Sequence, residues 1–109
     1  MRIYCVEYIY HHNLQAVKDE LRPAHRAFMR RLSDDGTLLA TGKLVSFSHE
    51  GSLSVVRARN AQQALEELSE DPYIEGGLVK DRVAREWKPV AGKLSFGDLN
   101  PKEQSVPWQ

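Results

Sequence analysis

The sequence contains little cysteine, no excess charge of either sign and no long hydrophobic run. Cys5 is its one cysteine and cannot form a disulfide within the chain, which suits a reducing compartment. Fifteen basic and fifteen acidic side chains cancel, so nucleic acid and anionic membranes are not expected as partners. The apolar run over residues 3–9 is broken by Glu7 and is too short to span a membrane. We therefore expect a soluble, cytoplasmic protein.

The 109 residues are enough for one domain, which we place at residues 1–90. Alternating Ile, Val and Tyr over residues 2–10 predict a first strand that is largely apolar on both faces. Apolar side chains at three- and four-residue steps over residues 14–32 predict a helix. Because proline removes a hydrogen bond inside a helix, we expect Pro23 to open the main helix after a short first segment. Gly36 is expected to end that helix in the left-handed conformation.

Three further strands are predicted at residues 37–45, 52–59 and 78–90, and a second helix at residues 61–69, capped by Asn60. The order β-α-β-β-α-β is the ferredoxin-like α+β arrangement, a four-stranded antiparallel sheet with two helices on one face. The open face still carries Val and Leu side chains, so we expect a homodimer joined through the sheets. Gly42 interrupts the second strand where a side chain would obstruct a nearby group. Residues 91–109 show no period and are expected to form a C-terminal tail, either mobile or docked in its first half.

His25 and Asp71 are the residues on which we expect chemistry to depend. His25 lies on the apolar face of the predicted helix and, with Pro23 at the first position, in its first turn, where the helix dipole favours a neutral imidazole. A neutral imidazole is what proton transfer near neutral pH needs. Asp71 stands before Pro72 at the junction that leads to the last strand, and in this fold it can approach His25 and orient the ring. The alternatives are a core histidine bonded to a backbone carbonyl and an aspartate that caps a short turn.

Three neighbours of this pair are candidate substrate-binding groups. Arg22 could hold a carboxylate substrate through two hydrogen bonds, or it could pair with Asp19 or Glu20. Tyr8 and Tyr73 could line the same pocket, although tyrosines in such positions are usually core residues with a bonded hydroxyl.

A metal site is not expected. His11, His12, His25 and His49 do not have the spacing of zinc ligands, and Cys5 alone offers a thiolate. Cys5 lies in the middle of a strand, where a small buried hydrophobe is expected. The chain also lacks a glycine-rich phosphate loop and a serine nucleophile elbow. We expect no cofactor.

Several motifs occur together in a fixed order: Arg22-Pro23-Ala24-His25, the Gly36 turn, Thr41-Gly42, Glu70-Asp71-Pro72-Tyr73 and Gly76-Gly77-Leu78-Val79. In order and spacing they resemble the YciI-like (YCII-related) proteins, over about residues 3–90. The resemblance implies a dimeric α+β barrel built from ferredoxin-like protomers. It also implies a His–Asp active site at His25 and Asp71, with the family's arginine at Arg22 and its strand glycine at Gly42. Many members have proline after that glycine, whereas Lys43 places a cation there, beside the pocket.

The resemblance further implies cofactor-independent proton abstraction beside an activated carbon, because a few relatives remove HCl from chlorinated aromatic intermediates or isomerise lactones. The first hypothesis is a dehydrochlorinase-like lyase or muconolactone-isomerase-like isomerase that acts on a small anionic cyclic or chlorinated substrate. His25 would accept the proton, Asp71 would orient the ring and Arg22 would hold the anion, with Gly42 letting the ligand approach the backbone. The alternative is a non-catalytic small-molecule-binding or regulatory dimer. RNA binding is set aside because residues 52–59 offer no aromatic side chain for base stacking.

Overall fold

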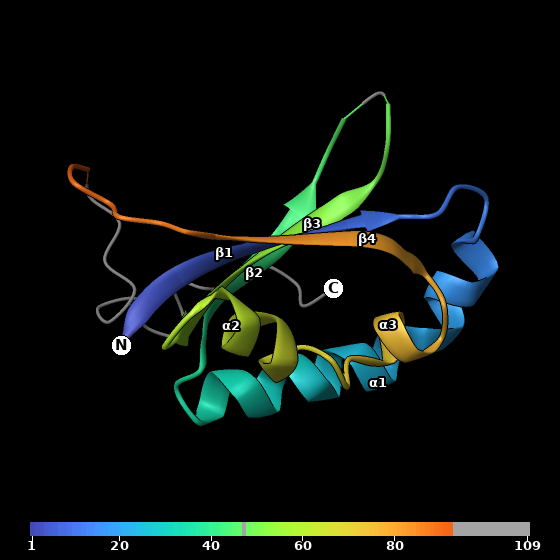
Figure 1. The fold of residues 1–109 in the computed structure, drawn as a ribbon. Helices are drawn as coiled ribbons and strands as arrows, with labels where there is room; N and C mark the ends of the chain where they lie inside the picture. Colours follow the sequence, from blue (N-terminus) through green and yellow to red (C-terminus); the bar gives the residue numbers. More distant parts are fainter. Residues whose placement is uncertain (47, 93–109) are drawn as a thin grey trace.

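The computed structural model of this chain describes residues 1–46 and 48–92. In chain order its elements are β1 (Arg2–Tyr10), α1 (Gln15–Asp34), β2 (Leu38–Leu44), β3 (Gly51–Ala58), α2 (Ala61–Glu67), α3 (Pro72–Glu75) and β4 (Val79–Glu86). The strands form one antiparallel sheet in the order β2-β3-β1-β4, and the helices lie on one face of it (Figure 1). This is the predicted ferredoxin-like α+β fold. Beyond residue 92, the expected tail lies outside the described residues.

β1 shows the alternation that the sequence predicts. Its even-numbered side chains from Tyr4 to Tyr10 are buried beneath the helices, and its odd-numbered ones from Ile3 to Ile9 are only half-buried on the opposite face. We call these the helix-covered face and the open face of the sheet. Because paired residues in an antiparallel ladder point the same way, the register assigns the rest of the open face. Its apolar members are Ile3, Cys5, Ile9, Ala40, Leu44, Leu53, Val55 and Val83.

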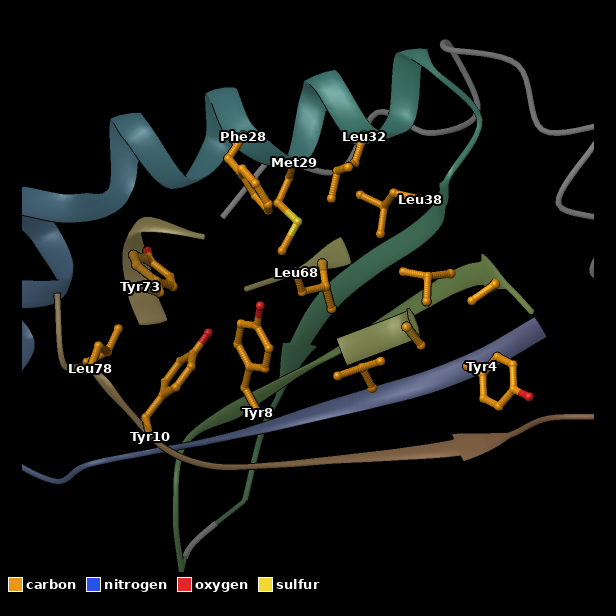
Figure 2. Packing of buried hydrophobic residues seen from close by; sticks show 14 residues of the cluster. Tyr4, Tyr8, Tyr10, Phe28, Met29, Leu32, Leu38, Leu68, Tyr73 and Leu78 are labelled. Carbon is orange, nitrogen blue, oxygen red and sulfur yellow. The ribbon is translucent and has the colours of Figure 1, made fainter. Parts of the chain in front are cut away.

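The hydrophobic core lies between the helix-covered face and α1. Tyr8 and Tyr10 reach from β1 toward the helices, and Phe28 and Met29 descend from α1 to meet them, while Tyr4 lies farther along the sheet (Figure 2). Burying one such side chain contributes about 1.5–3 kcal/mol relative to leaving it exposed. The core therefore fixes α1 against the sheet, and with it every side chain on the buried stripe of that helix.

The prediction that Pro23 begins the main helix is wrong. α1 is continuous from Gln15 to Asp34, with Pro23 inside it and exposed to solvent. Proline removes the hydrogen bond to the Asp19 carbonyl, but on the exposed side of a helix water can serve that carbonyl instead. The buried stripe passes behind Pro23 without interruption. His25 therefore lies in the middle of α1, where the dipole effect invoked from the sequence does not apply, because that effect fades within the first turn.

The end of α1 and the start of α2 agree with the boundaries predicted from the sequence, whereas β4 ends earlier than predicted. Gly36 has a φ of +86°, as the predicted left-handed cap requires, and the Asn60 side chain accepts a hydrogen bond from Gln63 N–H at 2.8 Å to cap α2. β4 ends at Glu86, short of the predicted limit at residue 90, since Pro89 has no N–H for a ladder. α3 is an additional short helix that the sequence indicated only as a turn.

Among the helices of residues 1–46 and 48–92, none is long and apolar enough to cross a membrane.

Candidate functional site

His25 and Asp71 meet in the core. His25 Nδ1 lies 2.7 Å from Asp71 Oδ1, and the two residues are 3% and 0% exposed. His25 comes from the middle of α1, whereas Asp71 caps the N-terminus of α3. The two helices can approach closely because Gly76, at the end of α3, has no side chain where a Cβ would collide with Leu21 of α1. The contact thus depends on how α3 packs against α1 (Figure 1).

Asp71 accepts hydrogen bonds from two further groups. The backbone N–H of Tyr73 donates to Oδ1 at 3.0 Å, and the Tyr8 hydroxyl donates to Oδ2 at 2.9 Å. Since an ionised carboxylate only accepts, His25 Nδ1 carries the hydrogen in the contact with Asp71. Nε2 of His25 has no hydrogen-bond partner among the described residues. With Nδ1 protonated, Nε2 is the basic nitrogen of the neutral ring.

Aromatic contacts fix the plane of the His25 ring. Tyr73 stacks on it, with ring centroids 3.8 Å apart and an interplanar angle of 3°. Tyr10 in turn meets Tyr73 edge-on, at 5.9 Å and 84°. Figure 2 shows Tyr73 beneath α1 and above Tyr10 of the sheet. The imidazole is therefore held by Asp71 at one atom and by Tyr73 across its face.

Burial keeps the tyrosine hydroxyls of this cluster protonated. It raises the pKa of Tyr8 far above its ordinary value and the pKa of Tyr10 to about 12. It also raises the pKa of Tyr73, against the lowering effect of nearby Arg22. Among the described residues, the hydroxyls of Tyr10 and Tyr73 are buried without a partner of full hydrogen-bond geometry, although Ser52 and Arg22 lie close enough to influence them. Both hydroxyls therefore keep their hydrogen at neutral pH.

The structure brings some of the predicted substrate-binding residues to the pair and not others. Tyr8 and Tyr73 contact it directly. Arg22 forms an ion pair with Asp19 at 3.0 Å, one of the two partners considered, and it also faces the Tyr73 hydroxyl. Lys43 pairs with Ser52, opposite Tyr8 in the next strand, so it lies on the helix-covered face.

Gly42 is not part of this site. It pairs with Leu53 and so belongs to the open face, on the other side of the sheet from His25. A Cβ built at Gly42 meets no atom within 4 Å. The expectation that a side chain there would obstruct a nearby group is therefore wrong for the single chain.

Lys18 is a charged residue of this region that the sequence argument missed. It is 6% exposed, its Nζ lies 5.1 Å from the centroid of the Tyr10 ring, and its nearest carboxylate is Glu50, at 3.6 Å. The available signal was its spacing: Lys18, Arg22 and His25 follow one another at steps of four and three on α1. A lysine on the same stripe as a buried histidine should have been included among the candidates.

The geometry around His25 and Asp71 bears on both alternative explanations of the pair. His25 is not a core histidine bonded to a backbone carbonyl, because its Nδ1 partner is a carboxylate. Asp71 does cap a short turn, as the second alternative held, and it contacts His25 with the same oxygen. Within the described part of the chain, no three His, Cys, Asp or Glu side chains are grouped so that they could hold a metal ion.

Comparison with known proteins identifies a family and a shared fold. The YCII-related domain family matches residues 1–88. The solved structure of 5-chloro-2-hydroxyhydroquinone dehydrochlorinase from Burkholderia phenoliruptrix, in complex with 2,5-dihydroxybenzoquinone, is similar with a TM-score of 0.68 and 16% identity, covering 79% of this chain and 93% of that one. An antibiotic biosynthesis monooxygenase has a TM-score of 0.51 and 12% identity, covering 84% of this chain and all of the other. None of the curated proteins compared with the chain matches it.

Proposed function

This chain belongs to the YCII-related domain family, and we propose that it is a cofactor-independent lyase or isomerase in which His25 and Asp71 transfer a proton. The observation that carries the proposal is the buried 2.7 Å contact between His25 Nδ1 and Asp71 Oδ1. It leaves Nε2 as the basic nitrogen, and it places a carboxylate where it stabilises the imidazolium that forms. Tyr8 and Tyr73 act as positioning residues, because they hold the carboxylate and the plane of the ring.

The proposed step is a proton transfer from substrate to His25 Nε2. In an elimination, the electron pair of the broken bond to hydrogen forms a new double bond, and chloride leaves with the electron pair of the C–Cl bond. His25 then releases the proton to water, so that HCl is lost overall. In an isomerisation, His25 returns the proton to a different carbon of the same substrate. General base catalysis of this type contributes about 10²–10⁴-fold.

The substrate class rests on the structural neighbour and on the charges near the pair. The neighbouring dehydrochlorinase carries a small quinone. Arg22 lies near the Tyr73 hydroxyl, Lys18 lies over the Tyr10 ring, and Lys43 lies close enough to influence Lys18; together these cations favour an anion. We therefore expect a small anionic cyclic or chlorinated substrate.

A homodimer joined through the open face belongs to the same proposal. Ile9, Leu53 and Val83 lie on that face, and Val83 is 41% exposed. Glu7 lies between Leu53 and Val83 on the same face, so the apolar side chains are interspersed with charged ones. Exposed apolar side chains on a sheet face that no helix covers favour an interface. The partner would cover the surface that one chain leaves half-buried, as in the dimeric barrel that the sequence resemblance implies.

The test is turnover by the wild type and by His25→Gln. The purified protein is incubated with 5-chloro-2-hydroxyhydroquinone and with unsaturated lactone acids, and chloride release and substrate loss are followed by ion chromatography and NMR. Glutamine keeps a polar side chain but cannot accept the proton, so His25→Gln is expected to lose about 10²-fold or more of the rate. Lys88→Gln, which changes a side chain that is 80% exposed, is the control and should keep the wild-type rate. Equal rates in wild type and His25→Gln would contradict the proposal, and binding without turnover would favour the non-catalytic dimer.

A further inference from the structure

Lys18 carries a buried charge whose described partners are the Tyr10 ring, with its centroid 5.1 Å from Nζ, and the Glu50 carboxylate. Buried ammonium groups normally have close, hydrogen-bonded partners. The carboxylate nearest to Lys18 Nζ is Glu50 Oε2 at 3.6 Å, beyond the usual 2.7–2.9 Å of a charge-assisted hydrogen bond, and the Glu50 side chain is 56% exposed. Burial lowers the pKa of Lys18; Glu50 opposes that shift, while Lys43 and Arg22 add to it. An anion closer than Glu50 would relieve this imbalance.

Lys18 faces a hollow that such an anion could enter. The hollow has a volume of ≈ 350 Å³ and lies between the β1–α1 connection and the β2–β3 connection, with Lys18, Glu50 and Gln15 in its lining. The first turn of α1 lies at this hollow, has no acidic residue, and begins at Leu14 without a side-chain cap. The N-terminus of a helix carries positive potential, which adds to that of the lysine. Both features favour a negatively charged occupant.

We propose that this hollow binds a carboxylate group of the substrate, with Lys18 Nζ as its main donor in place of Glu50. The inference rests on the proposed function in one respect, namely that the carboxylate belongs to the molecule that reacts at His25. A carboxylate is favoured over other anions because the chain's own Glu50 carboxylate already faces the lysine there. A carboxylate of the ligand would pair with Lys18 Nζ at a shorter distance than Glu50 does.

The position of the hollow along α1 bears on the shape of that substrate. Lys18 and His25 lie on one face of α1, seven residues apart, which corresponds to about 10 Å along the helix axis. Lys18 lines the hollow, whereas His25 is not among its lining residues. A substrate that reacts at His25 and pairs with Lys18 would therefore carry its carboxylate at the end remote from the reacting atom.

The test uses benzoate as the probe and isothermal titration calorimetry on the full chain at neutral pH. Lys18→Met keeps the length of the side chain and removes its charge, so benzoate should bind at least about tenfold more weakly. Lys88→Met, at a position where the lysine side chain is 80% exposed, is the matched control and should bind as the wild type does. Glu50→Gln removes the competing carboxylate and should bind severalfold more tightly, which gives a second test should Lys18→Met fold poorly.

Several results would overturn the inference. Benzoate affinity that is equal in Lys18→Met and wild type, or unchanged or weaker in Glu50→Gln, would contradict the role of Lys18. The inference would also fail if benzoate did not bind to the wild type, or if inorganic phosphate bound more tightly than benzoate. The affinity measurement needs no turnover, so it is independent of the His25→Gln experiment. Loss of rate in His25→Gln without an effect of Lys18 would refute this inference alone, and the reverse pattern would refute the proposed function alone.

Discussion

Replacing Asp71 with asparagine should separate the structural and chemical roles of this carboxylate. Asparagine has nearly the same shape, so its carbonyl can still accept from His25 Nδ1–H and Tyr73 N–H, while its amide faces Tyr8. The Tyr8 hydroxyl can rotate to accept where it formerly donated. Three charge-assisted contacts become neutral ones, each weaker by about 1 kcal/mol. Relief from burying a charge offsets part of that loss, so we expect a net loss of about 1–2 kcal/mol in the free energy of unfolding.

The effect of Asp71→Asn on the rate, expressed as an activation free energy, should exceed its effect on the free energy of unfolding. Without the carboxylate, nothing of opposite charge at that position stabilises the imidazolium, and we expect a fall in kcat on the order of 10²-fold or more. Asp71→Ala is unsuitable, since it leaves three buried donors without an acceptor, and at about 1–3 kcal/mol each the cost approaches the whole stability of a domain.

Urea unfolding monitored by circular dichroism measures the stability change, and chloride release measures the rate. Tyr8→Phe is the matched control, because it removes one of the three contacts and keeps the charge of Asp71. It should cost about 1 kcal/mol and reduce the rate far less than Asp71→Asn does. The reasoning is refuted if Asp71→Asn keeps the wild-type rate, or if Tyr8→Phe and Asp71→Asn reduce the rate equally.

Three further predictions concern stability and assembly. Lys18→Met should raise the free energy of unfolding by about 1 kcal/mol in urea titrations, because an apolar side chain replaces a buried ammonium; a loss of stability would mean that Lys18 is structural. Burial raises the pKa of Tyr10 to about 12, above the value near 10 of an unfolded chain, so the folded state keeps this proton longer. Stability should therefore fall as the pH rises from about 10 to about 12, and Tyr10→Phe should show a shallower fall; equal slopes would argue against this assignment. Leu53→Glu places a second carboxylate opposite Glu7 on the open face and should reduce the mass in solution from twice 12.4 kDa to 12.4 kDa, whereas a wild type that is already monomeric would exclude the proposed dimer.

The fold could be predicted from the sequence because its main signals are local. The alternation in β1, the stripe of α1 and the caps at Gly36 and Asn60 each depend on neighbouring residues, and each is present in the structure. Pro23 misled the prediction because the rule for proline inside a helix is also local. Whether a helix continues past proline depends on the packing of the stripe on both sides, and that is a tertiary property.

The site depends more strongly on long-range packing, and its prediction was less complete. The sequence indicated that His25 and Asp71 could meet, but the contacts of Tyr8 and Tyr73 with them arise only when α3 packs on α1 over the sheet. The burial of Lys18 depends likewise on β1 lying beneath α1. Gly42 was placed at the site from a resemblance, whereas the side of a strand that a residue occupies is decided by register.

The most direct test of the central claim is the tautomer of His25, read from the ¹⁵N chemical shifts of its ring by long-range NMR correlation at a pH where the ring is neutral. The account predicts a hydrogen on Nδ1, held by Asp71, and an unprotonated Nε2 that is available as the base. A hydrogen on Nε2 would mean that Asp71 does not hold this tautomer. It would contradict the assignment of His25 Nε2 as the proton acceptor.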